Sequence, residues 1–256
     1  MSAKVLAVTN QKGGVGKTTT AVNLSYYLAK SGNKVLLIDF DPQGNATSGL
    51  GVDKSKLTTS ILDVIDKTAS LDDVKVRLPY KNLNLAPATP DLANAEPGLA
   101  QMKDRFVRLK NGIKAVKDDY DFIVIDVPPS LGLLTVNALT AAKYVVLPVQ
   151  AEFYALEGLS QLLETMQLVR KSLNPGLELL GVLVTMFDSR TTLSGQVYEE
   201  VAKYFPGKIM KTKIPRNVRL AEAPSNGLPV GAYDSLSKGA RAYKAATNEL
   251  KERIVK

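Results

Sequence analysis

The sequence predicts an α/β fold, a three-layer arrangement in which a mostly parallel, twisted sheet carries helices on both faces. Short aliphatic and β-branched runs alternate with longer amphipathic segments along the chain, which is the pattern of strands joined by crossover helices. The runs 35–38 and 122–125 are apolar at every position, as expected of strands buried on both faces. No linker or internal repeat interrupts the pattern, so residues 1–256 are expected to form a single domain.

The expected strands are short runs rich in valine, leucine and isoleucine. In chain order they lie at residues 5–9, 35–39, 83–86, 122–126, 144–148, 179–185 and 208–213. The expected helices are segments whose apolar residues recur at spacings of three and four. They lie at residues 17–30, 99–117, 135–142, 156–173, 193–204 and 238–253.

The composition narrows the chemistry, because the chain contains no cysteine and no histidine. Without cysteine there is no disulfide framework, no cysteine-ligated zinc or iron–sulfur cluster and no thiol nucleophile. Without histidine there is no Ser-His-Asp triad and no imidazole base or metal ligand. Catalysis must therefore rest on carboxylates, lysines, hydroxyls, backbone amides and a hard cation, which favours phosphate chemistry.

The charge balance favours an anionic partner. There are 33 Lys and Arg residues against 25 Asp and Glu residues, a net charge of +8. Nucleic acid or anionic lipid fits this charge, and a merely solvated basic surface fits it equally well. The first apolar segment, residues 4–8, is too short for a signal peptide, and no run approaches the roughly 20 apolar residues of a membrane span. A cytoplasmic location is expected.

A glycine-rich loop, KGGVGKT at residues 12–18, lies directly after the first strand and directly before the first helix. This is the context of a P-loop, in which successive N–H groups and the helix N-terminus face phosphate oxygens. In such a loop Lys17 meets the β- and γ-phosphates and the Thr18 hydroxyl binds Mg²⁺. The alternative is a glycine-rich turn that only begins a helix. The expected nucleotide-binding residues of the loop, with ATP and Mg²⁺ as ligands, are Lys12, Gly13, Gly14, Val15, Gly16, Lys17, Thr18 and Thr19.

Two aspartate-containing segments follow apolar strands. The segment DFDPQGN begins at Asp39 and includes Asp41, and the segment DVPPS begins at Asp126. Open α/β sheets bind ligands at the carboxyl ends of their strands, and proline stiffens the loops that leave them. Because these segments share a sheet with a P-loop, we expect the carboxylates to lie near the phosphates.

The loop departs from the general P-loop pattern, since Gln11 stands where the first glycine is usual and Lys12 adds a second lysine. In these features the sequence resembles the deviant Walker A ATPases, which include the ParA/Soj partition proteins, MinD and the nitrogenase iron protein. The resemblance implies that Lys12 reaches across a dimer interface to the partner's nucleotide. Without the resemblance, a solvated or locally paired lysine is the simpler interpretation.

The resemblance also implies roles for the three aspartates. Asp41 orients or activates the attacking water, and Asp39 and Asp126 lie around Mg²⁺. The segments that begin at Asp41 and Asp126 then act as switches whose positions depend on the γ-phosphate. The expected catalytic residues are Lys12, Lys17 and Asp41, and the expected metal-binding residues are Thr18, Asp39 and Asp126.

Within this group the sequence resembles chromosomal ParA/Soj proteins nearly from end to end. The stretches that carry the resemblance are 41–45, 126–135, 148–152, 155–159 and 214–225. Only a few residues precede the first expected strand, so the extra N-terminal DNA-binding domain of larger plasmid ParA proteins is expected to be absent. By family position, Pro215 and Asn217 are candidates for adenine contacts.

The C-terminal part of the chain is the most basic. Residues 186–256 contain 13 Lys and Arg residues against 7 Asp and Glu residues, and the stretch 208–219 contains five basic residues and no acid. Such a surface would bind the DNA backbone without reading bases, and a solvated basic edge is the alternative. The resemblance implies DNA binding by Arg190 and Arg219. The full set of expected DNA-binding residues is Arg190, Lys211, Lys213, Arg216 and Arg219.

The last helix carries a stripe of small and apolar residues, namely Ala240, Tyr243, Ala246, Leu250 and Ile254. This stripe can pack on the sheet or lie on a membrane. Its small size and the lack of Phe and Trp favour packing, which argues against a MinD-like protein that depends on a bilayer.

These observations together predict a Mg²⁺-dependent ATPase switch for chromosome or plasmid partitioning. The ATP-dependent sandwich homodimer is expected to bind nonspecific double-stranded DNA, and a ParB-type partner is expected to release it by stimulating hydrolysis. The protein is expected to be cytoplasmic and nucleoid-associated, with no membrane partner. The alternative is a MinD-like, membrane-associated ATPase that controls cell division or protein positioning.

Overall fold

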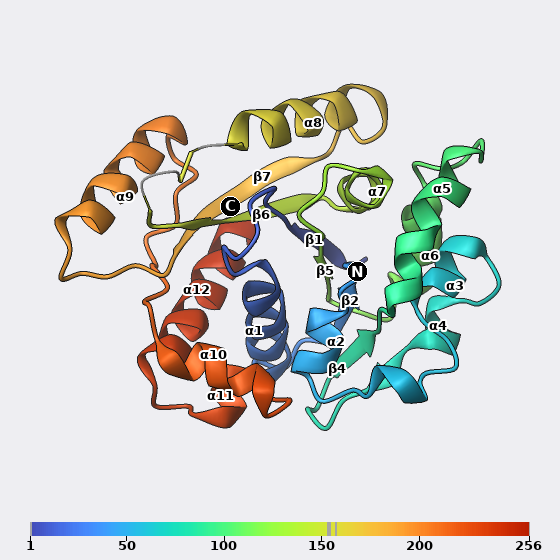
Figure 1. Cartoon of the computed structure of the whole chain (residues 1–256), viewed down its shortest axis with the longest axis horizontal. Helices are drawn as coiled ribbons and strands as arrows, with labels where there is room; N and C mark the ends of the chain where they lie inside the picture. Colours follow the sequence, from blue (N-terminus) through green and yellow to red (C-terminus); the bar gives the residue numbers. More distant parts are fainter. Residues whose placement is uncertain (1, 153–154, 157, 256) are drawn as a thin grey trace.

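The computed structural model of the chain describes residues 2–152, 155, 156 and 158–255. In this part of the chain seven strands form one sheet in the order β3-β4-β2-β5-β1-β6-β7 (Figure 1). The strands are β1 (Lys4–Val8), β2 (Val35–Asp39), β3 (Val76–Arg77), β4 (Leu83–Ala86), β5 (Phe122–Asp126), β6 (Tyr144–Gln150) and β7 (Glu178–Thr185). Neighbouring strands pair in parallel, except that the short edge strand β3 is antiparallel to β4.

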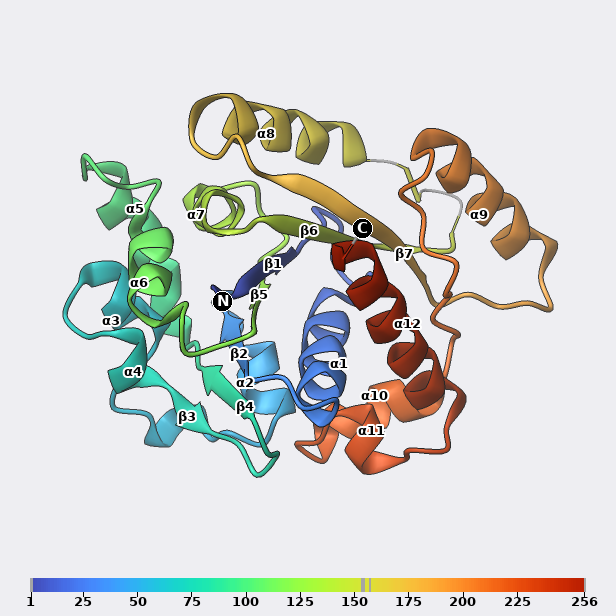
Figure 2. The same ribbon diagram turned by 180° about the vertical axis from the view of Figure 1, so that it is seen from behind.

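Helices cover both faces of the sheet (Figures 1 and 2). The first half of the chain contributes α1 (Lys17–Lys30), α2 (Asn45–Gly49), α3 (Ile61–Asp66), α4 (Leu71–Val74), α5 (Ala95–Ala100) and α6 (Arg108–Val116), with the short 3₁₀ turns η1 (Lys54–Lys56) and η2 (Pro90–Asn94). The second half contributes α7 (Leu133–Ala141), α8 (Leu159–Ser172), α9 (Thr192–Tyr204), α10 (Val218–Ser225), α11 (Val230–Tyr233) and α12 (Lys238–Val255).

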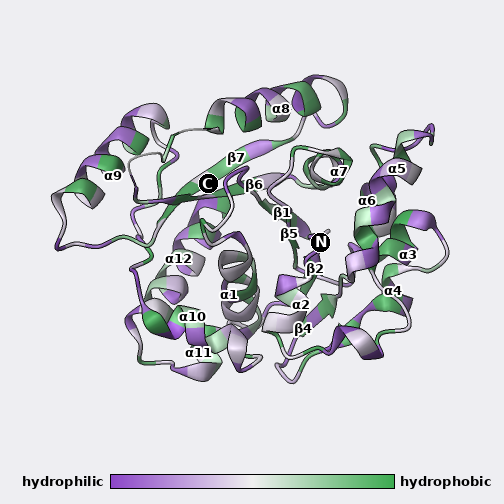
Figure 3. Cartoon of the chain, viewed as in Figure 1, coloured by the Kyte–Doolittle hydropathy of each residue, from purple (hydrophilic) through white to green (hydrophobic). Residues whose placement is uncertain are grey.

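The strand residues alternate between two cores, one on each face of the sheet. In β1, Val5 and Ala7 belong to the core that holds residues of α3 to α9, whereas Leu6 and Val8 belong to the core that holds residues of α1 and α12. All five residues of β2 and of β5 are buried, and much of the central sheet is coloured as hydrophobic in Figure 3. The predicted three-layer, mostly parallel fold is confirmed.

The prediction of a strand at residues 208–213 is wrong. The segment runs beside β7 but forms only isolated bridges, in which Val182 pairs with Ile209 and Phe187 pairs with Pro215. The amides of Lys211 and Thr212 donate to the Glu249 carboxylate at 2.8 and 2.9 Å. Because these two amides point to α12, they cannot take part in a continuous ladder with β7.

The prediction of one helix over residues 99–117 is also wrong, since the chain forms α5 and α6 with a turn between them. The side chain of Asn137, on α7, holds this turn. Its amide nitrogen donates to the Arg105 carbonyl at 2.6 Å, and its amide oxygen accepts from the Leu109 N–H at 3.3 Å. A side chain 28 or more residues away thus takes backbone groups that a continuous helix would pair internally.

Smaller differences concern element ends and short elements. The expected helix at 156–173 is α8, which begins at Leu159, and Glu157 lies outside the described residues. The elements β3, α2, α3, α4, α10 and α11 were not expected from the hydrophobic pattern. They are short, so their patterns span too few residues to reveal a period.

The stripe of α12 packs inside the protein, as predicted. Ala240, Tyr243, Ala246 and Leu250 are all buried in the core shared with α1, and Ile254 packs against that core. Over the described residues, no helix combines the length and the apolar character that crossing a membrane requires.

Candidate functional site

Three loops that leave neighbouring strands meet at one edge of the sheet. Strand β5 lies between β2 and β1, and in its register Asp126 pairs with Asp39 on one side and with Val8 on the other. The glycine-rich loop begins at Lys12, four residues after Val8. The fold therefore brings Asp39, Asp126 and the loop together, as the sequence predicts for a phosphate site.

The glycine-rich loop adopts a conformation that requires glycine. Gly14 and Gly16 have φ values of 75° and 86°, and Gly16 begins α1 in the left-handed conformation. A Cβ atom added at Gly13 or Gly14 would meet no described atom within 4 Å. The loop backbone is thus open on the side where a phosphate chain would approach the N-terminus of α1.

Lys17 is the central cation of this edge. Its Nζ donates to the Lys12 carbonyl at 2.9 Å, so the side chain folds back over the loop, and the residue is only 7% exposed. Burial lowers the pKa of Lys17, while the charges of Asp126 and Asp41 act in the opposite direction. A buried ammonium group therefore faces two carboxylates from the neighbouring loops.

Lys12 sits at the entrance of the loop and is about one-third exposed. Its backbone N–H donates to Asn10 Oδ1 at 2.9 Å, and Asn10 Nδ2 donates to the Pro148 carbonyl at 2.7 Å. Its Nζ lies 3.9 Å from Glu152 Oε2. In a single chain Lys12 is therefore locally paired, at the outer limit of an ion pair.

Asp39 is fully buried at the end of β2 and is fixed by α2. Its Oδ2 accepts from both the N–H and the hydroxyl of Thr47, each at 2.7 Å, and its Oδ1 accepts from the Asp41 N–H at 3.3 Å. Burial raises the pKa of Asp39, and the hydrogen bonds from Thr47 partly offset this effect. Asp41 is also buried, and its Oδ1 accepts from the Gln43 N–H at 2.9 Å.

Asp126 differs from Asp39 in its hydrogen bonding. It is 1% exposed, and neither carboxylate oxygen has a hydrogen-bond partner among the described residues. Burial raises the pKa of Asp126 well above its usual range, the charge of Asp39 raises it further, and Thr18 and Lys17 partly offset both effects. A buried carboxylate with free oxygens beside a threonine hydroxyl suits a hard cation and its water shell. Within the described ranges there is no cluster of three or more acidic side chains that could hold a metal alone, so phosphate oxygens would have to complete the coordination.

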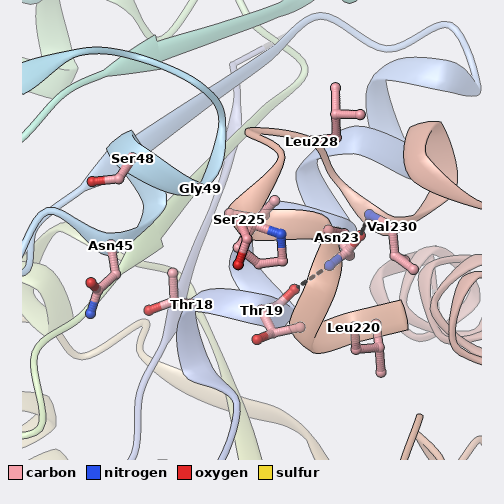
Figure 4. Close-up of a pocket in the computed structure, with 13 residues that line it drawn as sticks. Thr18, Thr19, Asn23, Asn45, Ser48, Gly49, Leu220, Ser225, Leu228 and Val230 are labelled. Atoms are coloured by element: carbon pink, nitrogen blue, oxygen red, sulfur yellow. Dashed lines mark hydrogen bonds between the residues drawn. The ribbon is translucent and has the colours of Figure 1, made fainter. Parts of the chain in front are cut away.

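A pocket of about 360 Å³ lies beside the loop, between α1, α2 and α10 (Figure 4). Thr18 and Thr19 line it from α1, Asn45 lines it from α2, and Ser225 lines it from α10. Asn23 closes one end, because its side chain donates to the Thr19 carbonyl at 2.8 Å and accepts from the Val230 N–H at 2.9 Å. This polar pocket was not expected from the sequence, because its walls include α2 and α10, which the hydrophobic pattern does not predict.

A second pocket, of about 240 Å³, adjoins the first at Thr19. Pro215 and Asn217, the candidates for adenine contacts, line it together with Gly16. Asn217 Oδ1 is buried and has no hydrogen-bond partner in the described part of the chain. Tyr243 forms part of the wall and shares a hydrogen bond of 3.0 Å with Thr20. The structure thus places both candidates in one pocket with Gly16 of the phosphate loop.

Comparisons with known proteins agree with this geometry. The family described as AAA domain matches residues 3–179. The sporulation initiation inhibitor protein Soj of Bacillus subtilis is 56% identical over 247 residues, which are 96% of this chain and 98% of the relative. The chromosome partitioning protein ParA of Myxococcus xanthus is 47% identical and covers 98% of this chain and 88% of its own length.

The chain belongs to the Soj/ParA family of chromosome-partitioning ATPases. A solved structure, described as cobyrinic acid a,c-diamide synthase from Mycobacterium smegmatis with bound ADP and magnesium, superposes with a TM-score of 0.88 at 39% identity. It covers 99% of this chain and 96% of its own. The similarity to these proteins therefore extends over nearly the whole chain, including the basic C-terminal elements.

The three arginines of the expected DNA-binding set are exposed, but each lies beside a carboxylate. Arg190 Nε and Nη2 donate to the two oxygens of Asp188 at 2.9 and 2.7 Å. Arg219 lies 2.7 Å from Glu222 and 3.4 Å from Asp234. Arg216 Nη2 lies 3.6 Å from Glu152 Oε1, and the same carboxylate approaches Lys12.

The two lysines of the expected DNA set lie in different surroundings. Lys211 is exposed, and its backbone is held by Glu249. Lys213 is half-buried, with its Nζ 3.8 Å from the ring centre of Tyr198 and 4.7 Å from that of Phe187. These cation–π contacts give Lys213 a structural task that the count of basic residues did not reveal.

Sequence reasoning missed several residues that shape the site of this Soj/ParA protein. Thr47 fixes Asp39, and its position eight residues further along the chain gives no local signal of this contact. Glu222 follows Arg219 by three residues, a helical ion-pair spacing that would have been visible had α10 been expected. Asp234 reaches Arg219 from the loop before α12, and no sequence pattern indicates that contact.

Proposed function

We propose that this Soj/ParA protein is a Mg²⁺-dependent ATPase switch whose ATP-bound sandwich dimer holds nonspecific double-stranded DNA. The observation that carries this proposal is the convergence of Lys17, Thr18 and the unpartnered Asp126 carboxylate at one sheet edge. Lys17 would balance negative charge on the phosphates of ATP, and the Asp126 carboxylate would balance positive charge on Mg²⁺.

In the proposed reaction the protein positions the attacking water and the nucleotide and neutralises phosphate charge. Phosphoryl transfer to water needs little covalent catalysis beyond this. Lys17 binds the β- and γ-phosphates, and the N–H groups of residues 13–19 bind their oxygens. Asp41 holds the attacking water in line with the γ-phosphate. Thr18, Asp39 and Asp126 would hold Mg²⁺, which would neutralise phosphate charge.

The second pocket supports adenine binding by Pro215 and Asn217. The buried, unpartnered Oδ1 of Asn217 is an acceptor that suits the exocyclic amino group of adenine. Guanine carries a carbonyl oxygen at the corresponding position, and two acceptors facing each other would leave both unpaired. We therefore expect ATP to bind more tightly than GTP.

Dimerisation is proposed to depend on Lys12. Its side chain is partly exposed and only weakly held by Glu152, so it is free to move to the phosphates of a partner subunit. A two-fold dimer applies the same contact twice. Light scattering with hydrolysis blocked and Mg²⁺–ATP saturating should therefore report a dimer, and a monomer under these conditions would contradict the proposal.

DNA binding is proposed for the surface formed by Arg190, Lys211, Lys213, Arg216 and Arg219. Phosphate contacts are independent of base sequence, and the contributions of two subunits add while the dimer persists. Hydrolysis, stimulated by a ParB-type partner, then releases the DNA. We propose accordingly that the protein is cytoplasmic and associates with the nucleoid.

The deciding experiment measures binding to random-sequence duplex DNA and to anionic vesicles, each with and without Mg²⁺–ATP. DNA binding that requires ATP supports the partition switch. Vesicle binding without DNA binding would instead support the MinD-like alternative, against which the burial of the α12 stripe argues.

A further inference from the structure

The proposed switch gives no role to the carboxylates that lie beside Arg190 and Arg219. We propose that Asp188, Glu222 and Asp234 compete with DNA phosphate for these arginines and thereby keep the DNA affinity of a single subunit low. This inference rests on the proposed function and concerns the regulation of the same surface.

The cluster around Arg219 carries more negative than positive charge. Arg219 Nη1 lies 2.7 Å from Glu222 Oε2, one helical turn away on α10, and Arg219 Nε lies 3.4 Å from Asp234 Oδ2. The hydroxyl of Tyr233 donates to the same Glu222 oxygen at 3.2 Å, which holds that carboxylate in place. One guanidinium group thus faces two carboxylates, and the local sum of these three charges is negative.

The pair formed by Arg190 is neutral and geometrically complete. The guanidinium group binds both oxygens of Asp188, and the Arg190 backbone N–H adds a third bond to Asp188 Oδ1 at 3.0 Å. The charge and hydrogen bonds of Arg190 hold the pKa of Asp188 well below its usual range. The carboxylate therefore stays ionised and continues to occupy the fork that a phosphate would use.

A carboxylate is an effective competitor because it offers a guanidinium group the same two-oxygen arrangement as a phosphate. Arg190 and Arg219 are 86% and 46% exposed, so water weakens these pairs and a DNA phosphate can displace the carboxylate. Replacing one of these carboxylates by a DNA phosphate gains little binding free energy for one subunit. When two subunits are held together on one DNA molecule, the small gains in binding free energy of both subunits add.

This pairing of arginines with carboxylates would explain why DNA binding depends on the nucleotide. A count of basic residues predicts that a lone subunit, with its excess of 13 basic over 7 acidic residues in 186–256, already binds DNA. The pairing observed in the structure lowers the charge that DNA meets at the arginines. Only a doubled surface, linked by ATP, would then offer enough contacts to overcome the competition.

The test replaces the competing carboxylates with neutral isosteres, using Asp188→Asn and the double variant Glu222→Gln with Asp234→Asn. Glu164→Gln is the control, because it removes one negative charge from an exposed site on α8, a helix that carries none of the proposed DNA-binding residues. Binding of a labelled random-sequence duplex is measured by fluorescence anisotropy at one salt concentration, first without nucleotide and then with Mg²⁺–ATP under conditions that block hydrolysis.

Without nucleotide, we expect Asp188→Asn to bind DNA about threefold more tightly and the double variant about tenfold more tightly, as released surface ion pairs allow. The control should change by less than about twofold. The ratio of the DNA affinity with ATP to the DNA affinity without ATP should be smaller in Asp188→Asn than in the control, and smallest in the double variant. Thermal melting of each variant verifies that the fold is intact.

Two outcomes separate this inference from the proposed function. If Arg219→Ala weakens DNA binding but the neutral variants bind like the control, the carboxylates do not compete and only the inference is overturned. If Arg219→Ala, Arg190→Ala and the neutral variants all leave DNA binding unchanged, this surface does not bind DNA and the proposed function loses its DNA site.

Discussion

The nucleotide edge and the basic surface handle charge in opposite ways. At the edge, Asp126 is buried and its carboxylate has no hydrogen-bond partner among the described residues, while Lys17 is buried nearby. At the basic surface, Arg190 and Arg219 are exposed, and each is paired with a carboxylate of its own subunit. The nucleotide edge therefore holds buried charges that are not fully paired, whereas the basic surface holds exposed charges that already have a partner of opposite sign.

The contrast indicates at which of the two regions a ligand gains more binding free energy. Burying a charge is costly unless it is paired, so a ligand that completes a buried site removes that cost. A ligand at an exposed, paired site must first displace the existing partner and gains only the difference. We therefore expect substitutions at the nucleotide edge to have larger effects than substitutions at the basic surface.

The largest effect is expected for Lys17→Ala. The variant removes the buried ammonium group that we propose binds the phosphates, and ATP affinity should fall by about 100-fold or more, since charge-assisted bonds in a shielded site are strong. Isothermal titration calorimetry measures this directly. An unchanged affinity would remove the P-loop assignment and with it the contrast between the two regions.

Asp41→Ala is expected to separate catalysis from binding. Hydrolysis should slow by about 100-fold, because the attacking water loses its positioned partner, while ATP affinity changes little. The dimer should then persist after ATP is added, which size-exclusion chromatography over time can follow. Turnover at the wild-type rate would show that Asp41 has no role in catalysis.

Arg219→Glu sharpens the comparison from the other side. Reversing one exposed charge beside two carboxylates should weaken DNA binding by about tenfold and leave ATP-dependent dimerisation intact. Gel shifts at matched salt, together with light scattering, measure the two properties separately. An unaltered gel shift would return the basic surface to a merely solvated edge.

The smallest effect concerns stability without ligand. Asp126→Asn removes a buried carboxylate that lacks a partner, so the free energy of unfolding in the absence of nucleotide and Mg²⁺ should rise by about 1 kcal/mol. The additional stabilisation by Mg²⁺–ATP should shrink in the same variant. Urea denaturation measures both quantities, and a loss of stability without ligand would mean that Asp126 is already compensated.

Much of the nucleotide edge could be predicted because its parts are local in the chain. A strand, a glycine-rich loop and a helix follow one another within residues 4–30, and each aspartate segment directly follows its own buried strand. The predictions of a strand at 208–213 and of one helix at 99–117 were wrong because these segments depend on contacts that are distant in the chain. Their backbone groups are taken by Glu249 and Asn137, side chains that the local pattern does not contain.

The layered fold, the phosphate loop and the identity of the charged residues can be read from the amino-acid sequence, because hydrophobic period, glycine and proline act on neighbouring positions. Which charges meet depends on how the chain packs. Asp126 faces Asp39 through strand register, and Arg219 meets Asp234 through the packing of separate segments. Electrostatic energy depends on distance in space and on burial, and neither quantity can be read from separation along the chain.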